Sequence, residues 1–170
     1  MILKELFIRK PKLSSKEIAA AIFDKLFKEE IIRTVKRFKK KSIDVDQTVK
    51  KNKLILIVIS LFVFIVDHST ISVYGNSKTS SKILNDFYDL LREEYNGYDR
   101  FIIELAQKFS IAYNKKPDPL LGLGIFFSKC INLKNDRDIL TAMIGTTETA
   151  KKIKMISNYY DAVNKEYKIY

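Results

Sequence analysis

The stretch LILIVISLFVFIV, residues 54–66, decides the fold of this 170-residue chain. It is rich in Ile, Val and Phe, so periodicity alone does not separate a buried helix from a buried strand. Length separates them, because a strand usually has about five or six residues. The pattern continues to Tyr74 and stops at Gly75-Asn76, which is a typical helix end. We therefore predict a buried apolar helix over residues 54–74.

A membrane-inserted helix is the alternative interpretation of the same run. As a helix its 13 residues cover about 20 Å, whereas the hydrocarbon core of a bilayer is about 30 Å thick. Extension to Tyr74 would include Asp67, and one Asp near a helix centre costs about 2.5–3.5 kcal/mol on insertion. Lysines at positions 50, 51 and 53 precede the run, as the positive-inside rule would require. The short length and the acidic residue favour a core helix.

Amphipathic patterns predict further helices on both sides of this run. Ser14 and Glu17 have the spacing of a capping box and open a helix that runs to about Lys40. Asp44 or Asp46 would cap the helix that contains residues 54–66. Later helices are predicted from residues 79–81, from Asp118-Pro119, from Asp136 to Gly145, which ends or bends that helix, and over about residues 153–167. Between the first two of these, Asn96-Gly97 predicts a turn, and a further helix follows with Phe101 and Ile102 on its apolar face.

These elements predict an all-α single domain over residues 1–170, an irregular bundle of about six or seven helices around helix 54–74. Residues 1–13 are ambiguous and could form a loosely attached N-terminal arm. Five glycines and three prolines are too few for the many turns of an all-β fold. The single cysteine, Cys130, excludes an intramolecular disulfide and fits a reducing compartment. We expect a cytoplasmic protein, with peripheral membrane attachment as an alternative.

Positive charge is concentrated in the first third of the chain. Residues 1–53 hold 16 Lys or Arg and 7 acidic residues, whereas the remaining chain holds 15 and 13. Lysine dominates, with 25 Lys against 6 Arg, which favours nonspecific attraction over base-specific contacts. The candidate residues for an anionic partner are Lys36, Arg37, Lys39, Lys40, Lys41, Lys50, Lys51 and Lys53. The first five also lie at a predicted helix C-terminus, where cations offset the helix dipole without any partner.

No pattern in the sequence predicts catalysis, a cofactor or a metal. Asp67-His68-Ser69 contains the only histidine, but consecutive helical residues point about 100° apart and do not form a triad with one another. One His and one Cys are too few for a typical zinc site. Gly122-Leu123-Gly124 lacks the strand, third glycine and helix of a nucleotide loop, so we expect close packing or a bend there.

The function expected from the sequence is therefore binding without chemistry. The leading hypothesis is a non-enzymatic helical module that binds another protein or a second copy of itself. The alternative is electrostatic binding of nucleic acid or of an anionic membrane surface through the basic third. An enzyme with a pocket near His68 would need partner residues that the sequence does not indicate. No small-molecule substrate is indicated.

Overall fold

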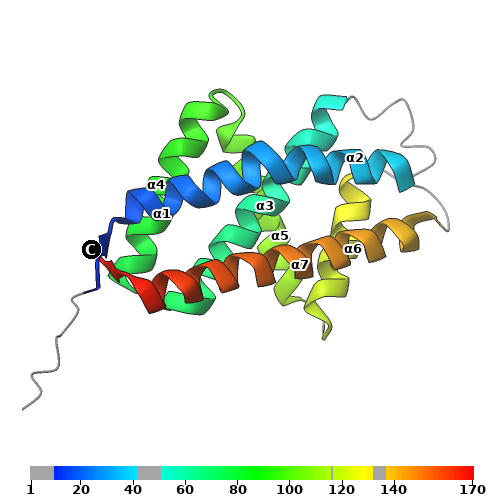
Figure 1. The fold of residues 1–170 in the computed structure, drawn as a ribbon. Helices are drawn as coiled ribbons and strands as arrows, with labels where there is room; N and C mark the ends of the chain where they lie inside the picture. Colours follow the sequence, from blue (N-terminus) through cyan, green and yellow to red (C-terminus); the bar gives the residue numbers. More distant parts are fainter. Residues whose placement is uncertain (1–9, 42–50, 116, 132–136) are drawn as a thin grey trace, which may run out of the picture.

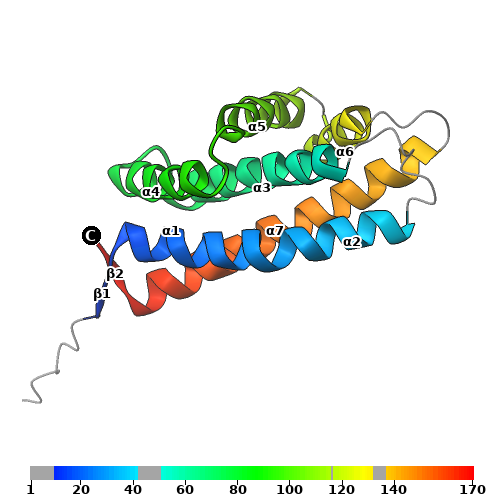
Figure 2. The same cartoon turned by 90° about the horizontal axis from the view of Figure 1, so that it is seen from above.

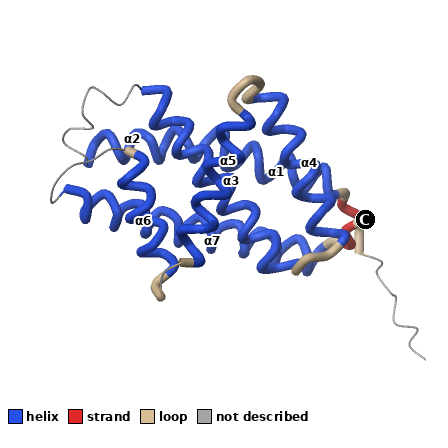
Figure 3. Tube along the Cα trace, turned by 180° about the vertical axis from the view of Figure 1, so that it is seen from behind, coloured by secondary structure: helices blue, strands red, loops and turns tan. Residues whose placement is uncertain are grey.

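A computed structural model describes residues 10–41, 51–115, 117–131 and 137–170, and these are almost entirely helical (Figure 1). Viewed from behind, the described chain is a set of packed helices with one short strand pair near the C-terminus (Figure 3). The predicted all-α bundle around a buried apolar helix is therefore confirmed.

The chain from Ser15 to Lys41 forms one continuous rod, which we call the N-terminal rod. It consists of α1 (Ser15–Phe23), the π-helix η1 (Asp24–Glu30) and α2 (Ile31–Lys41). Its first turn has the predicted capping box: the Glu17 amide donates to Ser14 Oγ at 3.2 Å, and the Ser14 amide donates to Glu17 Oε2 at 2.8 Å. The π-helical insert was not predicted. Wider π turns of this kind often occur at functional sites.

Helix α3 (Lys51–Tyr74) is the central element, as the sequence predicts. It packs against α2, α4, α5 and α7, and its residues 57–66 are all buried. Its buried hydroxyls are partly satisfied within the helix: Ser60 Oγ donates to the Leu56 carbonyl at 2.8 Å, and Thr70 Oγ1 donates to the Val66 carbonyl at 2.7 Å. The helix ends at Gly75, whose φ of 62° is left-handed. The predicted cap at Asp44 or Asp46 lies outside the described residues.

Three shorter helices follow: α4 (Lys78–Glu94), α5 (Asp99–Asn114) and α6 (Pro119–Cys130). Helix α4 begins slightly earlier than predicted, because Ser77 forms its cap with Ser80. Asp118 caps α6 as predicted, accepting from the Leu121 amide at 3.0 Å. Phe101 was predicted on the apolar face of α5, but it is exposed. That part of the prediction is wrong, because Ile102 occupies the buried face beside it.

The C-terminal part of the chain forms one long helix, α7 (Arg137–Glu166), rather than two. The prediction that a short helix ends at Gly145 is therefore wrong, whereas a bend there stays a prediction. A glycine inside a helix costs only about 1 kcal/mol relative to alanine. Packing of α7 against α6, which is more extensive than any other helix pair in the described chain, offsets this cost.

Two short strands, β1 (Lys12–Leu13) and β2 (Lys168–Ile169), pair in parallel and hold the two ends of the described chain together. The Lys168 amide donates to the Pro11 carbonyl at 2.9 Å, and the Tyr170 amide donates to the Leu13 carbonyl at 3.3 Å. This pair was not predicted. Residues 10–13 are thus attached to the domain, whereas residues 1–9 of the predicted arm lie outside the described residues.

The helices form two layers (Figure 2). One layer contains the N-terminal rod and α7, two long helical elements that lie side by side. The other layer contains α3, α4, α5 and α6, of which α4 and α6 run across the direction of α7 (Figure 1). We call the first layer the two-rod layer, because the candidate sites described below are concentrated in it.

Candidate functional site

An apolar groove of about 320 Å³ lies between the N-terminal rod and α7. Ile22, Leu26 and Ile156 form its floor and are almost fully buried. Ala21 is exposed at its edge, and the wall from α7 is half-buried. The groove is lined by Ala21 and Ile22 of α1, Lys25 and Leu26 of η1, and Met155, Ile156 and Tyr159 of α7. Apolar atoms that remain open to solvent in this way are typical of sites that bind a ligand or a partner.

The same interface becomes polar towards the end of α2. Glu30, which is buried, forms an ion pair with the buried Lys152 of α7 and with Arg33 Nη1 at 2.8 Å. These cations keep the pKa of Glu30 below its usual value although burial alone would raise it. The hydroxyls of Thr34 and Thr149 are buried in the same interface and have no hydrogen-bond partner among the described residues. We call Glu30, Thr34, Glu148, Thr149 and Lys152 the polar seam.

Sequence spacing explains why the groove and the polar seam lie in line. Ile22, Leu26, Glu30 and Thr34 are each four residues apart and therefore share one face of the rod. Lys152 lies four residues before Ile156 and shares the facing side of α7. Each rod thus presents an apolar half and a polar half to the other. The ion pairs fix the two rods at one end and leave the apolar groove open beside them.

The candidate basic cluster is only partly free for a partner. Arg37 Nη1 donates to both carboxylate oxygens of Glu148 on α7, each at 3.0 Å, so this arginine has a structural role. Lys36 and Lys53 are exposed and form no ion pair within the described ranges. Lys39, Lys40, Lys41 and Lys51 belong to helices, but their side chains lie outside the described residues, as does all of Lys50. Among the described side chains of this cluster, the structure therefore separates Arg37 from its neighbour Lys36.

Asp67, His68 and Ser69 point to different neighbours, as expected for consecutive helical residues. Tyr88 Oη on α4 donates to Asp67 Oδ2 at 2.6 Å. The His68 ring contacts those of Phe64 and Tyr113, with centroids 5.7 and 4.7 Å apart, and burial lowers its pKa. Ser69 Oγ is buried without a partner. The three side chains are not brought together into one site.

The remaining candidates are accounted for by packing. Gly122 and Gly124 are buried inside α6, which packs against α5 and α7. Cys130 is half-buried, and burial raises the pKa of its thiol to about 11, so it is a poor nucleophile at neutral pH. No group of three or more potential metal-ligating side chains occurs among the residues that the structure describes.

Helix α3 is the one described helix that is long and apolar enough to cross a membrane, over Lys53–Tyr74. Inside the fold, 72% of its most apolar window is buried. This degree of burial is what a core helix of a folded domain shows. Length and composition alone remain weak support for a membrane span.

Comparison with protein-family models, with curated proteins and with solved structures gave no match for this chain.

Proposed function

We propose that this protein is an interaction module that binds an acidic, amphipathic helical segment of another protein in the groove between the N-terminal rod and α7. The observation that carries the proposal is the solvent-open apolar groove beside a rigid, ion-paired seam. Amphipathic helices commonly bind in this way, with a few apolar anchors in a preformed groove. The non-enzymatic role expected from the sequence belongs to the same proposal.

The size of the groove supports a small number of anchor side chains. Its volume of about 320 Å³ is near the lower end of ligand pockets. Burial of one large apolar side chain contributes about 1.5–3 kcal/mol. Two such anchors would give a weak or moderate affinity, since association itself costs several kcal/mol.

The distribution of charge supports an acidic partner. The two-rod layer, residues 10–41 and 137–170, contains 17 Lys or Arg and 8 Asp or Glu. The opposite layer, residues 51–131, contains 10 and 8. Two acids of the two-rod layer, Glu30 and Glu148, are buried in ion pairs with cations. A negatively charged segment would therefore be steered to the two-rod layer, which contains the groove.

A designed peptide tests this proposal directly. The probe is a fluorescently labelled helix with leucines on one face and glutamates on the other, measured by anisotropy against the full chain. Replacement of its leucines by alanine should abolish binding, and replacement of its glutamates by lysine should weaken it strongly. Equal binding of all three peptides would contradict the proposal.

A matched pair of variants locates the site. Ala21→Glu places a carboxylate at the exposed edge of the groove, and Gln107→Glu adds the same charge at an exposed position of α5. Ala21→Glu should weaken binding about tenfold or more, the equivalent of 1.4 kcal/mol. Gln107→Glu should leave it nearly unchanged. If both variants behave alike, the groove is not the binding site.

A second copy of the chain is the other occupant to be tested. Light scattering over a range of protein concentrations measures whether the chain forms a dimer. A dimer that Ala21→Glu dissociates would assign the groove to self-association and overturn the acidic-segment proposal. A monomer at all concentrations leaves the groove free for the peptide.

Electrostatic binding of nucleic acid or of an anionic membrane is the second candidate function. The exposed Lys36 and Lys53 and the charge surplus of the two-rod layer support it. Its test is the replacement of Lys36, Lys39, Lys40 and Lys41 by glutamine, with Arg37 retained because it holds Glu148. Loss of binding together with a flatter salt dependence would support this candidate. An unchanged salt dependence would exclude these four lysines as the binding site for an anionic partner.

A further inference from the structure

A second, basic hollow lies at the end of the molecule where β1 and β2 pair. It has a volume of about 870 Å³ and is lined by Lys10, Pro11, Lys12, Tyr167 and Lys168. The residues come from opposite ends of the described chain, and the backbone hydrogen bonds of the strand pair hold them together. None of these lysines belongs to the basic cluster considered from the sequence.

The positive charge of this hollow is not neutralised within the described chain. Neither Lys12 nor Lys168 forms an ion pair with a described residue. Glu166, the acid nearest to Lys168 along the chain, is exposed and also forms no ion pair with any side chain that the structure describes. Elsewhere in the same layer Lys25 pairs with Glu29 at 2.8 Å, and Lys152 pairs with Glu30. Ammonium groups gathered without a carboxylate attract a multivalent anion.

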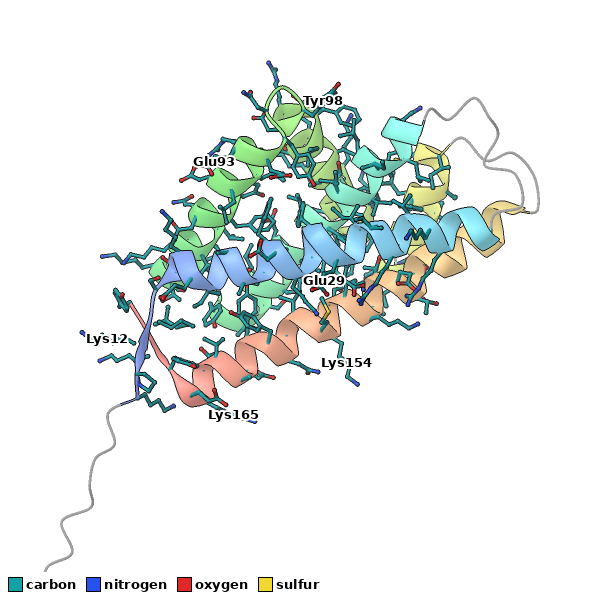
Figure 4. All side chains as sticks on the ribbon, turned by 45° about the horizontal axis from the view of Figure 1, so that its top comes forward. Lys12, Glu29, Glu93, Tyr98, Lys154 and Lys165 are labelled. Carbon is teal, nitrogen blue, oxygen red and sulfur yellow. The ribbon has the colours of Figure 1, made fainter. Side chains whose placement is uncertain are left out.

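Two of the three lysines are already held in position. Lys10 Nζ donates to the Asn164 carbonyl at 3.0 Å, near the negative end of the α7 dipole. Lys12 Nζ lies 5.8 Å from the centroid of the Tyr170 ring. Figure 4 shows that Lys12 and Lys165, from the last turn of α7, lie at the same end of the molecule. Ordering these side chains before binding lowers the entropic cost of holding an anion.

From these observations we infer that the Lys10–Lys12–Lys168 hollow binds a multivalent phosphate group. A phosphate oxygen accepts short hydrogen bonds from ammonium groups. A ligand with several linked phosphates can therefore contact all three lysines at once. The same chemistry is offered by a soluble oligophosphate and by a phosphorylated lipid headgroup. This site is separate from the groove, so either can fail without the other.

Titration of the full chain with tripolyphosphate, followed by amide chemical shifts, tests the site. A parallel titration with sulfate at equal ionic strength corrects for screening. The expected result is saturable binding, with the largest shifts at residues 10–13 and 165–170. Vesicles of phosphatidylcholine, with and without a phosphorylated phosphoinositide, distinguish the lipid source from the soluble one. Binding in either arm supports the site, and binding in neither overturns it.

Matched variants with equal loss of charge make the test specific. Lys12→Gln with Lys168→Gln should weaken phosphate binding about tenfold or more, since a hydrogen bond to a charged group is worth about that factor. Lys108 and Lys129 are exposed lysines of α5 and α6. Lys108→Gln with Lys129→Gln should change the affinity for phosphate by less than about twofold, because these charges lie away from the hollow and are screened by salt. Lys12→Arg with Lys168→Arg should retain binding. Equal losses in both glutamine pairs would show a general charge effect and overturn the proposal.

Discussion

Tyr88 of α4 donates a hydrogen bond of 2.6 Å to Asp67, an acid in the C-terminal third of the apolar core helix α3. The second carboxylate oxygen of Asp67, Oδ1, is buried and has no hydrogen-bond partner in the part of the chain that the structure describes. Burial raises the pKa of Asp67 from 3.8 to about 6, although the bond from Tyr88 opposes this shift. The same burial, with the charge of Asp67, raises the pKa of Tyr88. The two groups therefore make the stability of the fold depend on pH.

The folded state should lose stability as pH rises through the titration of Asp67. The Asp67 carboxyl binds its proton more tightly in the folded state than in the unfolded state. The loss of folding free energy therefore begins near pH 4 and is nearly complete once the pH is well above 6. A shift of this size corresponds to about 3 kcal/mol. The lowered pKa values of His68 and Glu30 act in the opposite direction, because stability rises with pH through their titrations. A difference between variants is therefore needed to isolate Asp67.

The free energy of unfolding of Asp67→Asn, relative to the unaltered chain, should change with pH. Denaturant titrations at pH 4 and pH 8 should show the difference shifting by about 2.5 kcal/mol in favour of the variant at pH 8. Asp86→Asn, a change at a carboxyl on α4, is the control. A difference that is the same at both pH values would contradict the burial of a charged Asp67.

Removal of Lys152 should be strongly destabilising, because it leaves the buried carboxylate of Glu30 with Arg33 alone. Lys152→Met should lower the free energy of unfolding by about 3–5 kcal/mol. Lys25→Met breaks an exposed pair with Glu29 and should cost about 1 kcal/mol or less. Thermal or denaturant unfolding measures both. A comparable cost for the two variants would mean that Glu30 is solvated.

Arg37 and its neighbour Lys36 should respond differently to the same substitution. Arg37→Gln removes the nitrogen that donates to both carboxylate oxygens of Glu148, a side chain that is 8% exposed, and should cost about 1–3 kcal/mol. Lys36→Gln should change stability by less than about 0.5 kcal/mol, because this side chain is exposed. Chemical denaturation distinguishes the two. Similar changes in the free energy of unfolding would mean that Arg37, like Lys36, contributes little to stability.

The hydroxyl of Tyr160 should contribute to holding α7 on α3. Tyr160 is fully buried, and its Oη lies 2.5 Å from Thr70 Oγ1. Since Thr70 donates to the Val66 carbonyl, Tyr160 is the donor in this bond. Tyr160→Phe should cost about 1–2 kcal/mol. Tyr74→Phe, which removes the more exposed bond to Asn164, should cost less, and a reversed order would contradict the assignment.

Local signals in the sequence were sufficient to predict most helix boundaries. The capping box of Ser14, the cap of Asp118 before Pro119, and the left-handed glycines 75 and 97 all act within a few residues of the boundary that they determine. The buried helix α3 followed from the length of its apolar run. These features need no information from elsewhere in the chain.

Long-range features could not be predicted in the same way. Arg37 belongs to a lysine-rich run, and its partner Glu148 is 111 positions away. The strands β1 and β2 have two residues each, too few for an alternating pattern, so the basic hollow was not visible either. Gly145 suggested a helix end, but tertiary packing on α6 overrides that weak local preference. The groove likewise requires knowledge of how α1 and α7 are placed.

Methyl chemical shifts provide the most direct test of the groove. Addition of the leucine–glutamate peptide to the methyl-labelled chain should shift the signals of Ile22, Leu26, Met155 and Ile156, which line it. The signals of Ile83 and Ile102, which are buried in the other layer, should remain in place. Shifts confined to the groove are expected for a peptide that binds there. Absence of shifts at these four residues, or shifts centred on α4 and α5, would contradict it.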